Sequence, residues 1–74
     1  MKKKAFQRIY TEITAITKAT CDVRADGIGY QDLAWVDGRP SQVIRIVDDL
    51  VTLQVFPGTE GISTKAEIIF SGQP

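Results

Sequence analysis

The chain has 74 residues, in which nine basic side chains balance nine acidic ones, and it contains no histidine. A chain of this length forms one domain and buries about 60% of its unfolded surface, which leaves only a thin core. Zero net charge excludes a nucleic-acid or membrane binder that works through overall charge. Lack of histidine removes the side chain most used for proton transfer near neutral pH. The composition therefore argues against a complete enzyme.

Basic residues concentrate at the start of the chain. Residues 1–18 carry five of them against one acid, whereas the remainder carries four against eight acids. We expect residues 1–5 to be a flexible basic terminus and residues 6–74 to form the domain. No apolar run after Lys4 has the length of a signal peptide, and none approaches the roughly 18 residues of a transmembrane helix.

Cys21 is the single cysteine, so the chain cannot form an internal disulfide or a thiolate metal cluster. A nucleophilic cysteine needs an activating base, and no histidine is available to act as one. We therefore expect Cys21 to be a buried or half-exposed thiol without a catalytic role.

The high content of β-branched residues favours strands, since isoleucine, valine and threonine together supply 22 residues. The first segment is ambiguous, because Phe6, Ile9, Ile13 and Ile16 recur at helical spacing. However, its threonines disfavour a helix, and Ile9, Thr11 and Ile13 fit one face of a strand. We predict a strand here.

Turn signals divide the rest of the chain into short strands. Asp37-Gly38 is the strongest hairpin signal, Asp48-Asp49 reads as a plain hairpin turn, and residues 26–29 and 57–61 are irregular. The strands predicted between these turns are Asp32–Val36, Ser41–Val47, Leu50–Phe56 and Lys65–Phe70.

Alternation predicts which side chains share a face of each strand. The predicted groups are Ile44 with Ile46, Val43 with Arg45 and Val47, Val51 with Leu53 and Val55, and Ala66 with Ile68 and Phe70. Short strands with frequent turns and no long helix indicate an all-β fold. In so small a chain we expect a single domain that is a closed six-stranded β-barrel, because closure removes exposed sheet edges.

Motifs for phosphate, dinucleotide or metal binding are absent from the sequence. The loop 57–62 lacks the lysine of a phosphate-binding loop, and Gly27-Ile28-Gly29 lacks the third glycine of a dinucleotide fingerprint. Asp48 and Asp49 lie at an expected tip, where water keeps both ionised and few further oxygen ligands are near. We therefore predict no catalytic, cofactor or metal site.

Aromatic side chains are the remaining candidates for function. We expect Phe56 and Phe70 to lie in the core, because each belongs to a strongly apolar strand. Trp35 is the best candidate for a contact surface, although a place in the core or at the rim of the barrel is the favoured interpretation.

The stretch Gln54-Val55-Phe56-Pro57-Gly58-Thr59-Glu60-Gly61-Ile62 resembles the segment QVFEGTxGL of a known family. Asp37-Gly38-Arg39 with Gln42-Val43-Ile44 resembles the hairpin of that family, 69–74 resemble its RFTGEP ending, and 10–16 resemble its opening strand. The family is the N-terminal domain of the B subunits of V-type and archaeal-type rotary ATPases. Candidate motif or interface residues are Trp35, Gln54, Val55, Phe56, Gly58, Thr59 and Gly61.

The resemblance implies a fragment of a longer, non-catalytic subunit. In this family, alternating A and B barrels form a collar around a hexameric head, and the B barrel also meets the peripheral stalk. The parent complex is an ion-translocating rotary ATPase or ATP synthase that binds ATP or ADP with magnesium. The resemblance implies that this complex is cytoplasmic and peripheral to the membrane. For the fragment itself it implies no cofactor, no nucleic-acid partner and no membrane insertion.

Two alternatives stay open. The first is a free-standing small barrel that binds single-stranded nucleic acid, for which the basic start of the chain and three arginines would supply the charge. The second is the equivalent barrel of an F-type or flagellar export ATPase subunit.

Overall fold

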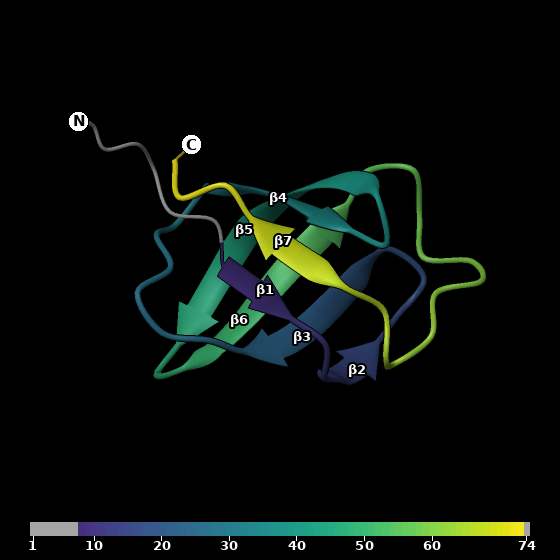
Figure 1. Cartoon of the computed structure of the whole chain (residues 1–74), viewed down its shortest axis with the longest axis horizontal. Coiled ribbons are helices and arrows are strands. Elements are labelled where there is room, and N and C mark those ends of the chain that lie inside the picture. The colour runs from purple at the N-terminus through teal and green to yellow at the C-terminus, as the bar shows by residue number, and fades with distance from the viewer. Residues whose placement is uncertain (1–7, 74) are drawn as a thin grey trace.

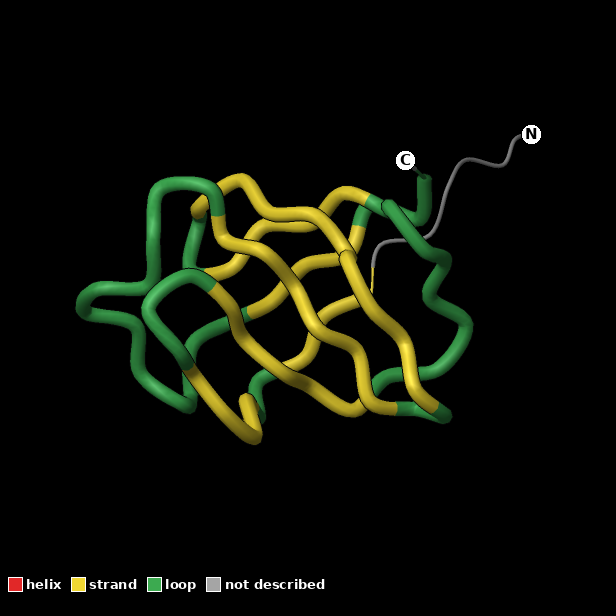
Figure 2. Tube along the Cα trace, turned by 180° about the vertical axis from the view of Figure 1, so that it is seen from behind, coloured by secondary structure: helices red, strands yellow, loops and turns green. Residues whose placement is uncertain are grey.

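One antiparallel sheet organises residues 8–73, the part of the chain that the computed structural model describes (Figure 1). Its strands are β1 (Arg8–Tyr10), β2 (Ile13–Ile16), β3 (Thr20–Arg24), β4 (Leu33–Val36), β5 (Arg39–Val47), β6 (Leu50–Val55) and β7 (Ile68–Phe70). They lie in the order β1-β7-β4-β5-β6-β3-β2. The sheet curls on itself, and loops gather at both of its ends (Figure 2). The predicted flexible terminus and Phe6 lie outside the described residues.

The two outermost strands, β1 and β2, follow each other in the chain. β1 pairs with β7 and β2 pairs with β3, while Thr11 and Glu12 connect them. The amide of Ile13 also donates to the carbonyl of Thr64 at 2.9 Å. The first segment thus crosses from one edge of the sheet to the other and nearly closes the barrel. The predicted all-β barrel is confirmed. Residues 8–73 form seven strands rather than the predicted six. Five strands are located from the sequence; the expected first strand is broken into two, and residues 20–24 add another.

The break also changes which side chains share a face. Ile13 is buried, whereas Ile9 and Thr11 are exposed, so the prediction that these three line one face is wrong. The irregular residues between β1 and β2 disturb the strict alternation of a single strand. No strand is predicted from the sequence for residues 20–24, although β3 lies there and places Cys21 and Val23 in the core.

A β-bulge in β5 overturns a second predicted pattern. The register with β6 shifts between Val43 and Arg45, so that Ile44 and Arg45 are both exposed. Beyond the shift Ile46 packs against the core, and Val47 is exposed. Ile44 and Ile46 therefore do not share a face, and Val43 does not share one with Arg45 and Val47, because a bulge inserts one residue and inverts the alternation.

The core comes from the inward positions of the strands. Alternation in β6 and β7 is as predicted, and Leu53, Ile68 and Phe70 are fully buried. However, β7 begins only at Ile68, so the prediction that this strand starts at Lys65 is wrong, because residues 64–67 form a turn and an irregular stretch before it. The ring of Tyr10 packs edge-on against that of Phe70, with centroids 5.6 Å apart. The buried apolar residues are Ile13, Cys21, Val23, Ala25, Ala34, Val36, Val43, Val51, Leu53, Val55, Ile68 and Phe70.

The predicted hairpin turns are confirmed. Asp37 and Gly38 join β4 to β5 with positive φ angles of 53° and 77°, the signature of a type I′ turn. Asp48, with φ of 57°, and Asp49 join β5 to β6. Arg24 on the neighbouring β3 forms an ion pair with Asp49 at 2.6 Å.

Arg39 fastens the long loop 56–67 to the start of β5. Its guanidinium donates to the carbonyl of Gly58 at 2.9 Å and to that of Glu60 at 2.7 Å. Thr59 in the same loop is buried, its amide donates to the carbonyl of Lys18 at 3.2 Å, and its hydroxyl donates to the carbonyl of Thr17. The loop is therefore held by separate side-chain and backbone hydrogen bonds rather than by a regular ladder.

We predict that Ile68→Val lowers the free energy of unfolding by about 0.5–1.5 kcal/mol, because Ile68 is fully buried and the lost methylene leaves a void. Ile69→Val is the matched control, since Ile69 points outward on the same strand and is only half-buried. Its effect should be clearly smaller. Urea unfolding measures both variants, and equal losses would contradict the assignment of faces.

We predict that Arg39→Met lowers the free energy of unfolding by about 1–3 kcal/mol, because two carbonyls lose a charged donor. Methionine keeps much of the length of the side chain. Arg45→Met, at an exposed position of the same strand, should stay within about 0.5 kcal/mol of the wild type. If the two variants were equally stable in urea, Arg39 would not fasten the loop.

Candidate interaction surface

A row of apolar side chains crosses the outer wall of the barrel. The strand register pairs Ile9 with Ile69, Ile69 with Trp35, and Trp35 with Pro40. Phe56 continues this row, since its amide donates to the carbonyl of Pro40 at 3.1 Å and it directly follows Val55. Cross-strand partners share a face, so these side chains lie side by side.

A second row follows beside the first. Leu33 pairs with Gln42, Gln42 with Gln54, and Gln54 with Thr20. All four are at least partly exposed. The two rows together form what we call the uncharged face: Ile9, Ile69, Trp35, Pro40, Phe56, Leu33, Gln42, Gln54 and Thr20.

The lack of charge, rather than exposure alone, sets this face apart from the rest of the outer wall, because Ile44 and Val47 outside the face are exposed to a similar extent. The exposed fraction is 57% for Ile9, 39% for Trp35 and 54% for Phe56, which is high for large apolar side chains. None of the nine positions bears a charge, whereas Arg45, Asp48 and Arg24 occupy outer positions nearer the other end of the sheet. Aromatic enrichment with depletion of charge characterises the core of a protein–protein interface. This composition favours protein contact over catalysis.

Three of the seven candidate residues come together on this face: Trp35, Gln54 and Phe56. The prediction that Phe56 lies in the core is wrong. The favoured interpretation for Trp35 is a place in the core or at the rim of the barrel, and of these two the core position is not observed, because the side chain is 39% exposed. The cause is alternation, because Val55 points inward and its neighbour Phe56 must point outward. The same alternation in the predicted strand Leu50–Phe56 already groups Phe56 with outward Gln54.

The other four candidates support the barrel and its loop. Val55 is in the core, at 1% exposure. Gly58 and Gly61 have φ angles of 93° and 83°, which favour glycine, and Thr59 anchors the loop to the preceding β2–β3 turn. The motif therefore fixes the path of the chain immediately after Phe56, and these four residues are not brought together with Trp35.

Sequence reasoning missed three members of the apolar row, namely Ile9, Pro40 and Ile69. A signal for Pro40 was present, because a two-residue turn at Asp37-Gly38 places it opposite Trp35. Ile9 and Ile69 come from strands far apart in the sequence, and only the sheet order brings them beside Trp35.

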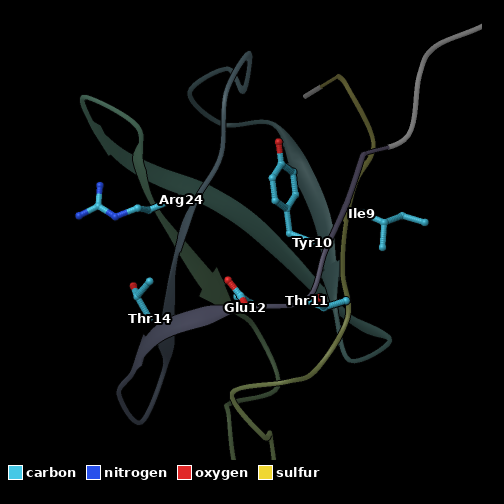
Figure 3. Close-up of a pocket in the computed structure, with 6 residues that line it drawn as sticks. All are labelled: Ile9, Tyr10, Thr11, Glu12, Thr14 and Arg24. Carbon is cyan, nitrogen blue, oxygen red and sulfur yellow. The ribbon is translucent and has the colours of Figure 1, made fainter.

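An open notch of about 320 Å³ lies where the broken first strand leaves β3 uncovered. Ile9 and Tyr10 point to opposite sides of β1 there (Figure 3). The notch is lined by Ile9, Tyr10, Thr11, Glu12, Thr14 and Arg24. The guanidinium of Arg24 is held by Asp49. The notch is thus a consequence of the way in which the barrel closes. Its lining residues include one carboxylate, that of Glu12, and no buried pair of reactive side chains.

Cys21 is fully buried on β3. Burial raises the pKa of its thiol, the negative charge of Asp22 raises it further, and Arg39 partly opposes both. Residues 8–73 bring together no group of three or more potential metal ligands from histidine, cysteine, aspartate or glutamate. The same residues contain no helix long and apolar enough to span a membrane.

Comparison with known proteins identifies the family. Residues 25–72 match the model of the ATP synthase alpha/beta family, β-barrel domain. The chain is similar to V-type ATP synthase beta chains of Treponema denticola, with 38% identity over 71 residues, and of Chlamydia felis, with 46% over 72. The beta chain of Chlamydia trachomatis serovar D is 44% identical over 73 residues.

These alignments cover 90–92% of this chain but only 16–17% of each relative. The chain thus corresponds to about a sixth of the length of these relatives. The resemblance that the QVF motif indicates is confirmed. Since the family model matches well over half of the chain, the chain belongs to the ATP synthase alpha/beta family, as its β-barrel domain.

Proposed function

We propose that this chain is the N-terminal β-barrel of the non-catalytic B subunit of a rotary V-type ATP synthase. It helps to hold the alternating A and B subunits of the head together while the complex couples ATP turnover to proton or sodium transport. The uncharged face carries the proposal, because a barrel that presents such a face is equipped for protein contact. Similarity to V-type beta chains supports the choice of subunit.

In this proposal the chemistry belongs to other parts of the complex. ATP, ADP and magnesium bind beyond the barrel, the head lies on the cytoplasmic side as a peripheral assembly, and the peripheral stalk is a further partner. The burial and raised pKa of the Cys21 thiol support a non-catalytic role, since the reactive form of a thiol is the thiolate.

The uncharged face weighs against the nucleic-acid alternative. Single strands bind where basic side chains accompany exposed aromatic rings. Trp35 and Phe56 instead lie beside Pro40, with Gln42 and Gln54 in the next row. The face would stack bases without neutralising their phosphates.

We predict that a B subunit without its barrel forms fewer hexamers with the A subunit than the intact B subunit does, because the contacts of the collar are lost. Native mass spectrometry of the two subunits, mixed at equal concentration, measures the hexamer fraction. The truncated protein must first be shown to be folded and monodisperse. Hexamers of unchanged stability would contradict the proposed function.

We predict that the 74-residue chain binds no ATP at micromolar affinity, with or without magnesium, because its loops lack the lysine and glycine spacing of a phosphate site. Isothermal titration of the chain measures this. The intact head serves as the positive control under the same conditions. Saturable binding by the chain alone would show that the barrel is more than a structural domain.

We predict that Cys21 reacts with a thiol reagent many times more slowly in the folded chain than in urea, because the thiol is buried and its pKa is raised. The raised pKa also means that its contribution to stability is present below the pKa of the unfolded thiol and declines as pH rises through the folded value. Similar labelling rates in both states, followed by absorbance, would show that the thiol is accessible.

A further inference from the structure

We propose that Asp26-Gly27, in the loop between β3 and β4, is a site of spontaneous isoaspartate formation in the folded chain. The identical dipeptide Asp37-Gly38 is protected from the same reaction by its hairpin turn. This covalent modification of the main chain requires only the two residues and water. It is therefore independent of the proposed function.

The reaction joins the side chain of an aspartate to the amide of the next residue. The amide nitrogen forms a bond to Cγ, and the hydroxyl of the protonated carboxyl leaves as water with the amide proton, so that a five-membered succinimide closes. Water then opens the ring at either carbonyl, which returns aspartate or gives isoaspartate, whose main chain runs through Cβ and Cγ. No group is oxidised or reduced.

Glycine favours ring closure when it follows the aspartate, because it has no side chain to obstruct the attacking nitrogen. Asp-Gly occurs twice in the sequence, at residues 26–27 and 37–38. The other four aspartates precede valine, leucine or aspartate, whose side chains hinder the approach. The sequence alone does not distinguish the two Asp-Gly pairs, so any difference in their reactivity comes from the fold.

The hairpin turn holds Asp37 in a geometry that prevents ring closure. Its φ of 53° belongs to the left-handed region, in which ψ is about +47°. At this angle the amide nitrogen of Gly38 is turned away from the Cβ of Asp37 and lies far from Cγ. Val36 pairs with Arg39 across the turn, and the amide of Asp37 donates to the carbonyl of Glu67 at 2.8 Å. The hairpin must therefore open before the ring can close.

Asp26-Gly27 lies in the loop 25–32, where no strand pairing fixes the backbone (Figure 1). Both residues are exposed, and Asp26 does not have the positive φ of Asp37. Within residues 8–73, the amides of Gly27 and Ile28 donate to no backbone carbonyl. The attacking nitrogen of Gly27 is therefore accessible, and the rotation that brings it to Cγ separates no strand pair.

The loop is anchored on both sides of the reactive dipeptide. The amide of Ala25 donates to the carbonyl of Asp49 at 2.9 Å, and the amide of Gly29 donates to the carboxylate of Asp32 at 2.9 Å. Isoaspartate adds one carbon to the main chain between these anchors, so the loop must change its path there. The isoaspartate fraction at this position thus rises with the time that the chain has spent folded.

The test compares the two dipeptides within one molecule. The folded 74-residue chain and the same chain in guanidinium chloride are incubated at neutral pH, while circular dichroism checks the folded sample. Digestion with endoproteinase Asp-N, which cleaves before aspartate but not before isoaspartate, and mass spectrometry with electron-transfer fragmentation measure isoaspartate at each position. In denaturant, the two positions should convert at similar rates.

In the folded chain, we expect Asp26 to convert within about twofold of its denatured rate, and Asp37 about tenfold or more below its own, because Asp37 reacts only after local opening. Asp26→Glu should abolish the product in the loop 25–32 and leave that at Asp37 unchanged, since glutamate would have to close a larger ring. Equal rates at both positions of the folded chain would overturn the proposal. So would isoaspartate in the loop of Asp26→Glu.

Discussion

The structure depends on one short segment that must serve both edges of the sheet. Residues 8–10 pair with β7 and residues 13–16 pair with β3, so the chain covers two edges that would otherwise expose unpaired backbone groups. The cost is a break at Thr11 and Glu12 and an open notch beside it. Because closure brings β1 beside β7, it also places Ile9 at the end of the apolar row. One end of the uncharged face thus depends on the way in which the barrel closes.

Alternation along each strand determines which side chains point into the core and which point outward. It is interrupted twice, by the break between β1 and β2 and by the bulge in β5. The break before β2 turns Ile13 inward, and the bulge at Val43 and Arg45 turns Ile46 inward after leaving two neighbours exposed. Where no interruption occurs, as in β6, alternate residues fill the core and the others face out. Phe56 follows this rule and belongs to the outer wall, despite its hydrophobicity.

Local signals in the sequence predict much of the fold. Asp37-Gly38 predicts its hairpin because both residues tolerate positive φ, and the alternation of Leu50–Phe56 predicts the inner face of β6. The bulge leaves no comparable signal, since Ser41–Val47 reads as a regular alternating strand. The apolar row was out of reach for a different reason: it joins residues 9, 35 and 69, and their proximity follows from a strand order that no local pattern specifies.

Hydrophobic side chains outside the core have a cost for a free protein of this size. An exposed row that contains Ile9, Trp35 and Phe56 invites non-specific association, and a lysine at any of these positions would be an easy remedy. Five basic side chains, Lys18, Arg24, Arg39, Arg45 and Lys65, belong to the part of the chain whose side chains the structure describes, and none of them lies on the uncharged face. The barrel has a small core, so large apolar side chains placed on its surface are lost to the core. Their presence on an uncharged surface is therefore better explained by contact with a partner. A partner that covers the row would turn the exposed area into binding energy. A nearly closed sheet, with the loop after Phe56 fastened by Arg39, would present that area in a fixed geometry.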